Sequence, residues 1–103
     1  MAESSVHKEH RQRVKERFRK EGLDSFTPVQ VLELLLFYVI PRKDTNEIAH
    51  YLLNRFGSLS MVLEAPMEEL MKVEGIGPEA AQFLHMMPAV GRRYLVDKTM
   101  QSK

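Results

Sequence analysis

One almost unbroken apolar stretch constrains the fold of this chain more than any other feature. The stretch "TPVQVLELLLFYVI" runs from Thr27 to Ile40, with the threonine suited to an N-cap and Pro28 to the first helical position. Its apolar residues recur at helical spacing and almost all round, and such a helix is buried. The other residues must therefore cover it, because it is shorter than the roughly 18 apolar residues of a membrane span.

Prolines, glycines and capping residues divide the rest of the chain into further helical segments. These segments are predicted at about 6–21, 45–56, 59–64, 66–73 and 78–98. The expected caps are Asp44 or Thr45 for the second of them and Ser58 for the third. The sequence therefore predicts an all-α fold, a compact bundle of about six short helices joined by short connections.

The length of 103 residues corresponds to one domain. We expect this domain over residues 6–99, with a disordered start at 1–5 and a frayed tail at 100–103. The chain has no cysteine, which excludes a disulfide framework and a thiolate zinc site. Its first residues are polar and do not resemble a secretory signal. A cytoplasmic protein without membrane association is the expectation.

The last predicted helix contains a proline. Pro88 removes a backbone donor and clashes with the preceding turn, which predicts a kink or a break between Met86 and Ala89. After Pro88, the apolar residues Val90, Tyr94 and Leu95 are predicted to lie on one side of the helix. We expect this part to continue as helix and to pack back on the core.

Charge is unevenly distributed along the chain. Residues 1–20 carry seven basic and three acidic side chains, a net charge of +4, whereas the remainder carries eight basic and eleven acidic ones, a net charge of −3. Local basic patches, and not the overall charge, would therefore attract a nucleic acid. No nucleophile has an organised base, and Glu47 with His50 forms a single Glu-x-x-His, too few ligands for a metal. The sequence predicts a non-catalytic chain with no metal site.

The joint "EGIGPEA", residues 74–80, separates the last two predicted helices. Gly75 and Gly77 permit positive φ, Ile76 is expected to anchor the joint in the core, and Pro78 to begin the last helix. Uncovered amides at a helix start favour an anion. We predict that a phosphate oxygen is bound by the backbone amides of Gly75, Ile76, Gly77, Glu79 and Ala80. The alternative is that the glycines only form a turn.

The joint and its flanks resemble the helix-hairpin-helix motif of DNA repair proteins, in the pattern Leu70-x-x-Val73-x-Gly75-Ile76-Gly77-x-x-x-Ala81-x-x-Leu84. Residues 7–97, with "LELLLFYVIPRKDTNEIAHYLLNRFGSLSMVLEAPMEELMKVEGIGPEAAQFL" at their centre, resemble the N-terminal helical domain of the RadC family of JAB-domain DNA repair proteins. The resemblance implies a tandem helix-hairpin-helix (SAM-like) core whose second hairpin spans 66–86. It also implies sequence-independent binding of duplex or branched DNA and a monovalent cation at the hairpin carbonyls.

Basic side chains beside the joint and on the N-terminal basic helix are the candidate DNA contacts: Lys72, Arg42, Lys43, Arg13 and Arg17. Arg42 and Lys43 lie at the tip of the first hairpin, in "IPRKDT". This tip is alternatively a solvated loop, and the basic helix alternatively a solvated one. Arg92 and Arg93 would help only if the fold brings them near the joint.

Two carboxylates stand beside the predicted phosphate site and favour a different function. Glu74 and Glu79 each oppose an incoming phosphate by about 0.2–1 kcal/mol if exposed. The second interpretation is therefore a protein-interaction domain, or a domain that positions substrate for a separate metal-dependent hydrolase domain of the JAMM type. RadC-like proteins generally carry such a domain, and nothing in these 103 residues matches it.

Overall fold

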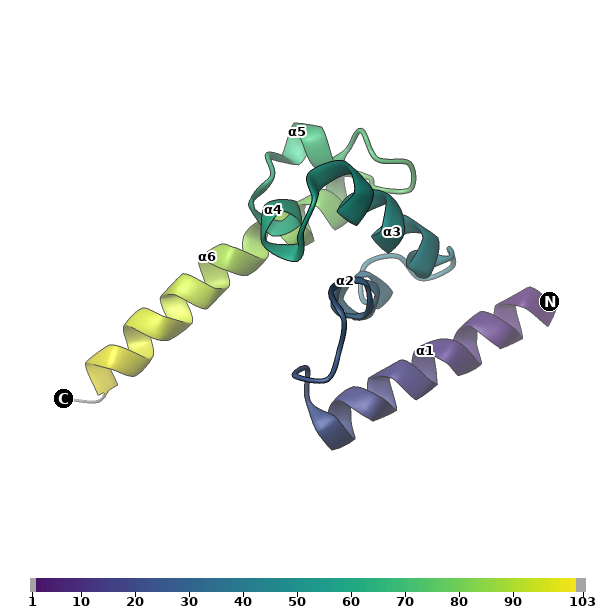
Figure 1. The fold of residues 1–103 in the computed structure, drawn as a ribbon, viewed down its shortest axis with the longest axis horizontal. Coiled ribbons are helices and arrows are strands. Elements are labelled where there is room, and N and C mark those ends of the chain that lie inside the picture. Colours follow the sequence, from purple (N-terminus) through teal and green to yellow (C-terminus); the bar gives the residue numbers. More distant parts are fainter. Residues whose placement is uncertain (1, 102–103) are drawn as a thin grey trace.

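The structure describes the backbone of residues 2–101 and the side chains of residues 6–101. This part of the chain contains six helices joined by loops (Figure 1). In this computed structural model they are α1 (Ala2–Glu21), α2 (Pro28–Phe37), α3 (Thr45–Phe56), α4 (Leu59–Glu64), α5 (Met67–Leu70) and α6 (Pro78–Gln101). No strand occurs among these residues, so the all-α prediction is confirmed. Helix α1 begins at Ala2, inside the segment predicted to be disordered. Met1, Ser102 and Lys103 lie outside the described residues.

The predicted caps fix where three helices begin. Thr27 accepts a hydrogen bond from the Gln30 amide, and the Gln30 side chain accepts one from the Thr27 amide, which completes a capping box. Asp44 accepts from the amides of Asn46 and Glu47 at the start of α3, and Ser58 caps α4. Each cap supplies an acceptor for amides that have no partner within the helix.

Helix α2 is buried on two sides, as its apolar sequence predicts. Leu32 and Leu36 have no exposed surface and face the main core. Leu34 and Phe37 face the opposite way and form a smaller cluster with Phe26, against which the partly buried Val14 of α1 packs. Helix α2 therefore lies between α1 and the other four helices (Figure 1).

The main core joins the two helical hairpins. Helices α2 and α3 pack against each other and form the first hairpin. Helices α5 and α6 pack against each other and form the second, and α4 packs on α6 beside it. Fully buried side chains come from every one of these helices, namely Leu32, Leu36, Ala49, Leu52, Val62, Leu70, Ala81 and Leu84. Burial of each leucine contributes about 1.5–3 kcal/mol. This shared core holds the joint after α2 next to the joint before α6.

Helix α6 differs from its prediction in two respects. It is continuous through Pro88, so of the predicted kink or break the break was wrong, because a single proline removes one hydrogen bond and the helix can continue past it. The kink stays a prediction. Its second half also does not pack on the core: Val90, Tyr94 and Leu95 are 52%, 59% and 60% exposed. Leu84 is the last buried residue of α6 among the described ones. The rest of the helix rises by about 1.5 Å per residue and extends away from the other helices toward the C-terminus (Figure 1). None of the helices described has the length and apolar character to cross a membrane.

Candidate functional site

The joint before α6 is fixed by one glycine with a left-handed backbone. Gly75 has a φ of 95°, a conformation that residues with a side chain rarely adopt. A Cβ atom at Gly75 would lie 2.7 Å from Cδ1 of Ile48 in α3, so any side chain here would force Ile48 to shift. Gly77 has no positive φ and open space around it. Of the two glycines that permit positive φ, only Gly75 adopts it.

Most of the predicted phosphate-binding amides are free. The amides of Gly75, Gly77, Glu79 and Ala80 donate no hydrogen bond within the described residues. The glycine turn and the first turn of α6 leave these amides without a partner, because the first amides of a helix have none inside it. The Ala80 residue is itself buried in the main core. The Ile76 amide is different, because it donates to Val73 O at 3.0 Å while the Ile76 side chain is buried in the core. Ile76 anchors the joint, as predicted, and its amide is not available to a ligand.

A groove of about 270 Å³ lies between the tips of the two hairpins, and we call it the tip groove. One wall consists of residues around the second joint and the other of residues that follow α2. The lining residues are Val39, Ile40, Pro41, Lys43, Gly75, Gly77, Pro78, Glu79 and Ala80. Among them Lys43 carries a positive charge and Glu79 a negative one. The fold thus brings Lys43 of the first hairpin to the free amides of the second.

Two other predicted contacts lie apart from this lining. Lys72 donates to Glu69 at 2.9 Å, and the same carboxylate accepts from Arg55 at 2.9 Å. These hydrogen bonds, first the one from Lys72 and then the one from Arg55, lower the pKa of Glu69 below its ordinary value. Lys72 is therefore held in an exposed ion pair with a carboxylate that it shares with Arg55. Arg42 is exposed at the tip of the first hairpin and does not line the tip groove.

The two predicted contacts on α1 have different surroundings. Arg17 lies over the Phe26 ring, with Cζ 4.5 Å from its centroid, and donates to Ser25 O at 2.8 Å. It holds α1 to the loop before α2, which reduces its availability to DNA. Arg13 is exposed on α1. Arg11, which was not among the predicted contacts, donates to the Lys43 carbonyl at 3.0 Å.

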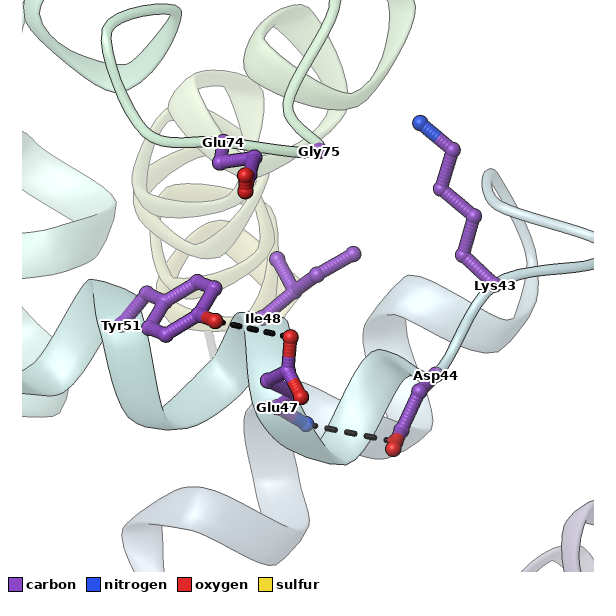
Figure 2. Close-up of a pocket in the computed structure, with 7 residues that line it drawn as sticks. All are labelled: Lys43, Asp44, Glu47, Ile48, Tyr51, Glu74 and Gly75. Atoms are coloured by element: carbon purple, nitrogen blue, oxygen red, sulfur yellow. Dashed lines mark hydrogen bonds between the residues drawn. The ribbon is translucent and has the colours of Figure 1, made fainter.

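A second pocket, of about 240 Å³, adjoins the tip groove and shares Lys43 and Gly75 with it. We call it the acidic pocket, because three carboxylates line it, those of Asp44, Glu47 and Glu74, together with Ile48 and Tyr51 (Figure 2). The Tyr51 hydroxyl donates to Glu47 at 2.7 Å. This hydrogen bond, with desolvation and the nearby carboxylates, raises the pKa of Tyr51. Lys43 lines both hollows, but it stands beside three carboxylates in the acidic pocket and beside one, that of Glu79, in the tip groove.

Figure 2 shows the Lys43 side chain reaching from the loop before α3 toward the loop that carries Glu74 and Gly75. Arg92 and Arg93 are not near this point, because both belong to the exposed second half of α6. Arg92 lines a different hollow, between α4 and α6, with His85 and Glu64. The only sequence-predicted cation that the fold brings to the free amides, within the described residues, is Lys43.

No group of three or more metal-ligating side chains occurs within the described part of the chain. The joint does offer carbonyl oxygens: Val73 O accepts from the Ile76 amide and Gly77 O from the Ala81 amide, each at 3.0 Å. A carbonyl has two lone pairs, so these oxygens keep one each for a monovalent cation. The cation itself stays a prediction from the resemblance.

These features define a small all-α module in which free backbone amides of one helical hairpin face a lysine of the other. Residues 6–82 match the family described as UPF0758 N-terminal, and the chain belongs to this family. The UPF0758 protein FN0909 of Fusobacterium nucleatum is 45% identical over 78 residues, which are 76% of this chain and 34% of the relative. The UPF0758 protein SPO0054 of Ruegeria pomeroyi is 37% identical over 94 residues, 91% of this chain and 42% of the relative. No solved structure matches the chain.

The chain therefore spans less than half the length of these two relatives. Both joints fall within the stretch that matches the family, since residues 38–44 and 71–77 lie inside 6–82. The exposed second half of α6 lies outside it.

Proposed function

We propose that this chain is a non-catalytic module that binds DNA without reading its sequence, by holding a backbone phosphate in the tip groove. A phosphate is the same at every nucleotide, so contacts of this kind position a protein on DNA and carry no base information. The proposal assigns the module to a DNA repair-related protein through its resemblance to the N-terminal helical domain of the RadC family and to tandem helix-hairpin-helix proteins.

The observation that carries the proposal is that four residues with unpartnered amides and one lysine line the same groove. The amides of Gly75, Gly77, Glu79 and Ala80 have no partner within the described residues, and Lys43 lines the opposite wall. Amides at a helix start combine hydrogen bonding with the positive end of the helix dipole. Together these groups match the charge and the several acceptor oxygens of one phosphate.

Glu79 opposes this function and limits the affinity. Its carboxylate belongs to the lining of the tip groove, whereas Glu74 lines the acidic pocket. Because Glu79 is exposed, its repulsion of a phosphate amounts to about 0.2–1 kcal/mol. Replacing Glu79 with glutamine is therefore expected to raise the affinity for DNA at low salt by up to about fivefold.

The test is a titration of the isotope-labelled chain with a short duplex and with a four-way junction at two salt concentrations. We expect the amide resonances of Gly75, Gly77, Glu79 and Ala80 to shift at low salt and to return as salt rises. The Ile76 amide, which is already bonded, is expected to shift less. If none of these resonances moves with either DNA at low salt, the proposed function is wrong.

Two glycine variants make this test specific. An added Cβ meets no atom within 4 Å at Gly77 or at Gly91, so both Gly77→Ala and Gly91→Ala leave the fold unchanged. The methyl group at residue 77 stands beside the free amides of the groove, while that at residue 91 lies on the projecting half of α6. We expect only Gly77→Ala to weaken DNA binding. Equal affinities of the two variants would argue against the groove.

A second candidate function is that of an interaction or positioning domain for a separate JAMM-type metal-dependent hydrolase domain. The acidic pocket supports it, since Asp44, Glu47 and Glu74 suit a basic protein surface better than DNA. The length of the relatives also supports it, because 58–66% of each lies outside the matched stretch. The test is a titration with the separately produced unmatched part of the Fusobacterium relative. Shifts at Glu47 and Glu74 that Glu74→Gln weakens would favour this function.

A further inference from the structure

The Arg11 side chain of α1 is hydrogen-bonded to both ends of the tip of the first hairpin. The Arg11 Nη1 donates to Phe37 O at 3.2 Å, and its Nη2 donates to Lys43 O at 3.0 Å. Its Cζ also lies 5.0 Å from the centroid of the Phe37 ring. A single guanidinium group therefore connects the last residue of α2 to the lysine that lines the tip groove.

The sequence explains why the Phe37 carbonyl is available. In a helix this oxygen would accept from the amide four residues later, but residue 41 is proline and has no N–H. The neighbouring carbonyl, Leu36 O, does find a backbone donor, the Ile40 amide at 2.8 Å. Arg11 supplies the donor that Pro41 lacks, and its second nitrogen extends the same fork to Lys43.

The environment of Arg11 favours an ordered guanidinium group. Burial against α2 lowers the pKa of Arg11 from its ordinary value, and the nearby Glu33 carboxylate partly opposes this effect. An arginine remains charged under these conditions. Because the group is partly desolvated and makes two hydrogen bonds at fixed geometry, it restricts the position of the loop far more than a solvated surface cation does.

We propose that Arg11 is a positioning residue of the tip groove, which holds the loop before α3 so that Lys43 faces the amides of Gly75, Gly77, Glu79 and Ala80. The inference rests on the proposed function and deepens it, because it makes α1 a part of the phosphate-binding site. In this arrangement Arg11 acts through Lys43 and does not itself contact the phosphate.

Other contacts keep α1 docked when Arg11 is replaced. His10 lies 3.0 Å from the buried carboxylate of Glu33, and its ring meets Phe37 edge-on. Further along α1, the Lys15 ammonium lies 4.7 Å from the centroid of the Tyr38 ring. A variant at residue 11 therefore loses the bonds to the hairpin tip while these contacts remain.

The experiment compares Arg11→Met and Arg11→Lys with Arg19→Met in the full chain. Lysine keeps the charge, but it is a single point donor and cannot bridge two carbonyls as the planar fork does. Arg19 serves as the control because its side chain pairs with Glu16 inside α1, and its loss changes the net charge by the same amount. The readouts are the amide resonances of Lys43, Asp44 and Glu33 without DNA, and the affinity for a short duplex at low salt.

We expect both Arg11 variants to shift the amide resonances of Lys43 and Asp44 and to leave the Glu33 amide resonance near its original position. We also expect both variants to weaken duplex binding by about three- to tenfold, as expected for one impaired phosphate contact. Arg19→Met is expected to leave the Lys43 amide unchanged and to weaken binding less. Restoration of both readouts by Arg11→Lys would show that only charge matters and would overturn the inference. Unchanged Lys43 resonances in Arg11→Met would overturn it as well.

The two proposals fail in different ways. If the unmodified chain binds no duplex, the proposed function fails, and the resonances of Lys43 still decide whether Arg11 positions the tip. If the unmodified chain binds DNA and Arg11→Met binds it equally well, the positioning role fails and the proposed function stands.

Discussion

Gly75 and Ile48 fit against each other so closely that the joint before α6 has no room for a side chain. A Cβ atom at Gly75 would lie 2.7 Å from Cδ1 and 2.9 Å from Cγ1 of Ile48. Ile48 belongs to α3 and is almost fully buried, so a side chain at Gly75 would force the Ile48 side chain to shift. The contact brings the joint before α6, whose Gly75 also lines the tip groove, close against α3.

The first prediction follows from this contact. Gly75→Ala introduces a side chain at a φ of 95° and against the buried Ile48, so we expect it to destabilise the fold by about 1–3 kcal/mol. Urea unfolding followed by circular dichroism measures this change. Gly77→Ala is the matched control two residues away, with no positive φ and no atom within 4 Å. We expect its stability to stay within about 1 kcal/mol of the original. A Gly75→Ala variant as stable as Gly77→Ala would contradict the close fit.

The sequence predicts those features of the fold that depend only on residues close to one another along the chain. Thr27, Asp44 and Ser58 act as caps within three residues of their own positions, so local chemistry suffices to identify them. The burial of α2 follows from its composition alone. The left-handed turn at Gly75 also agrees with the local pattern.

Features that depend on tertiary packing were not predictable in the same way. The tip groove forms only because the fold places Lys43 of the first hairpin beside Gly77 of the second. The sequence does not show that Lys43 lines this groove whereas Lys72 pairs with Glu69. The second half of α6 was expected on the core because its apolar residues repeat at helical spacing, but periodicity does not reveal where a neighbouring helix ends. The role of Arg11 depends on a carbonyl that Pro41 leaves without a donor.

A second prediction concerns the salt dependence of DNA binding. If Lys43 contacts a phosphate, Lys43→Gln lowers the slope of log K against log salt by about 0.9, the value for one neutralised phosphate. Lys20→Gln, at the exposed end of α1, is the control with the same loss of charge. Fluorescence anisotropy titrations of a labelled duplex at several salt concentrations measure both slopes. The assignment of Lys43 is wrong if its variant and the Lys20 variant have the same slope.

A third prediction compares two leucines of the same helix. Leu84 has no exposed surface, whereas Leu95 is 60% exposed. Leu84→Ala leaves a cavity in the main core and is expected to destabilise the fold by about 2–5 kcal/mol. Leu95→Ala is expected to change the stability by no more than about 0.5 kcal/mol. Thermal and urea unfolding of both variants provide the comparison, and a large loss of stability in Leu95→Ala would mean that the second half of α6 is covered in solution.

The last prediction concerns the pH dependence of stability at Glu69, which connects α5 to α3 through Arg55. Its pKa is lowered from 4.5, first by the hydrogen bond from Lys72. A carboxylate with a lowered folded-state pKa stabilises the fold above its unfolded-state pKa, and this contribution disappears as the pH falls through the folded-state value. The Glu69→Gln variant is therefore expected to be less stable than the original chain at pH 7 and equally stable well below pH 4.5.

Glu68 provides the control for this prediction. It is adjacent and exposed, and it forms no ion pair within the described residues. Urea unfolding of Glu69→Gln, Glu68→Gln and the original chain between pH 2.5 and pH 7 gives the difference in stability at each pH. The difference should narrow toward acid pH for Glu69→Gln and stay flat for Glu68→Gln. Parallel curves for the two variants would show that Arg55 and Lys72 do not stabilise the ionised carboxylate of Glu69, and Lys72 would then be free to take part in phosphate binding.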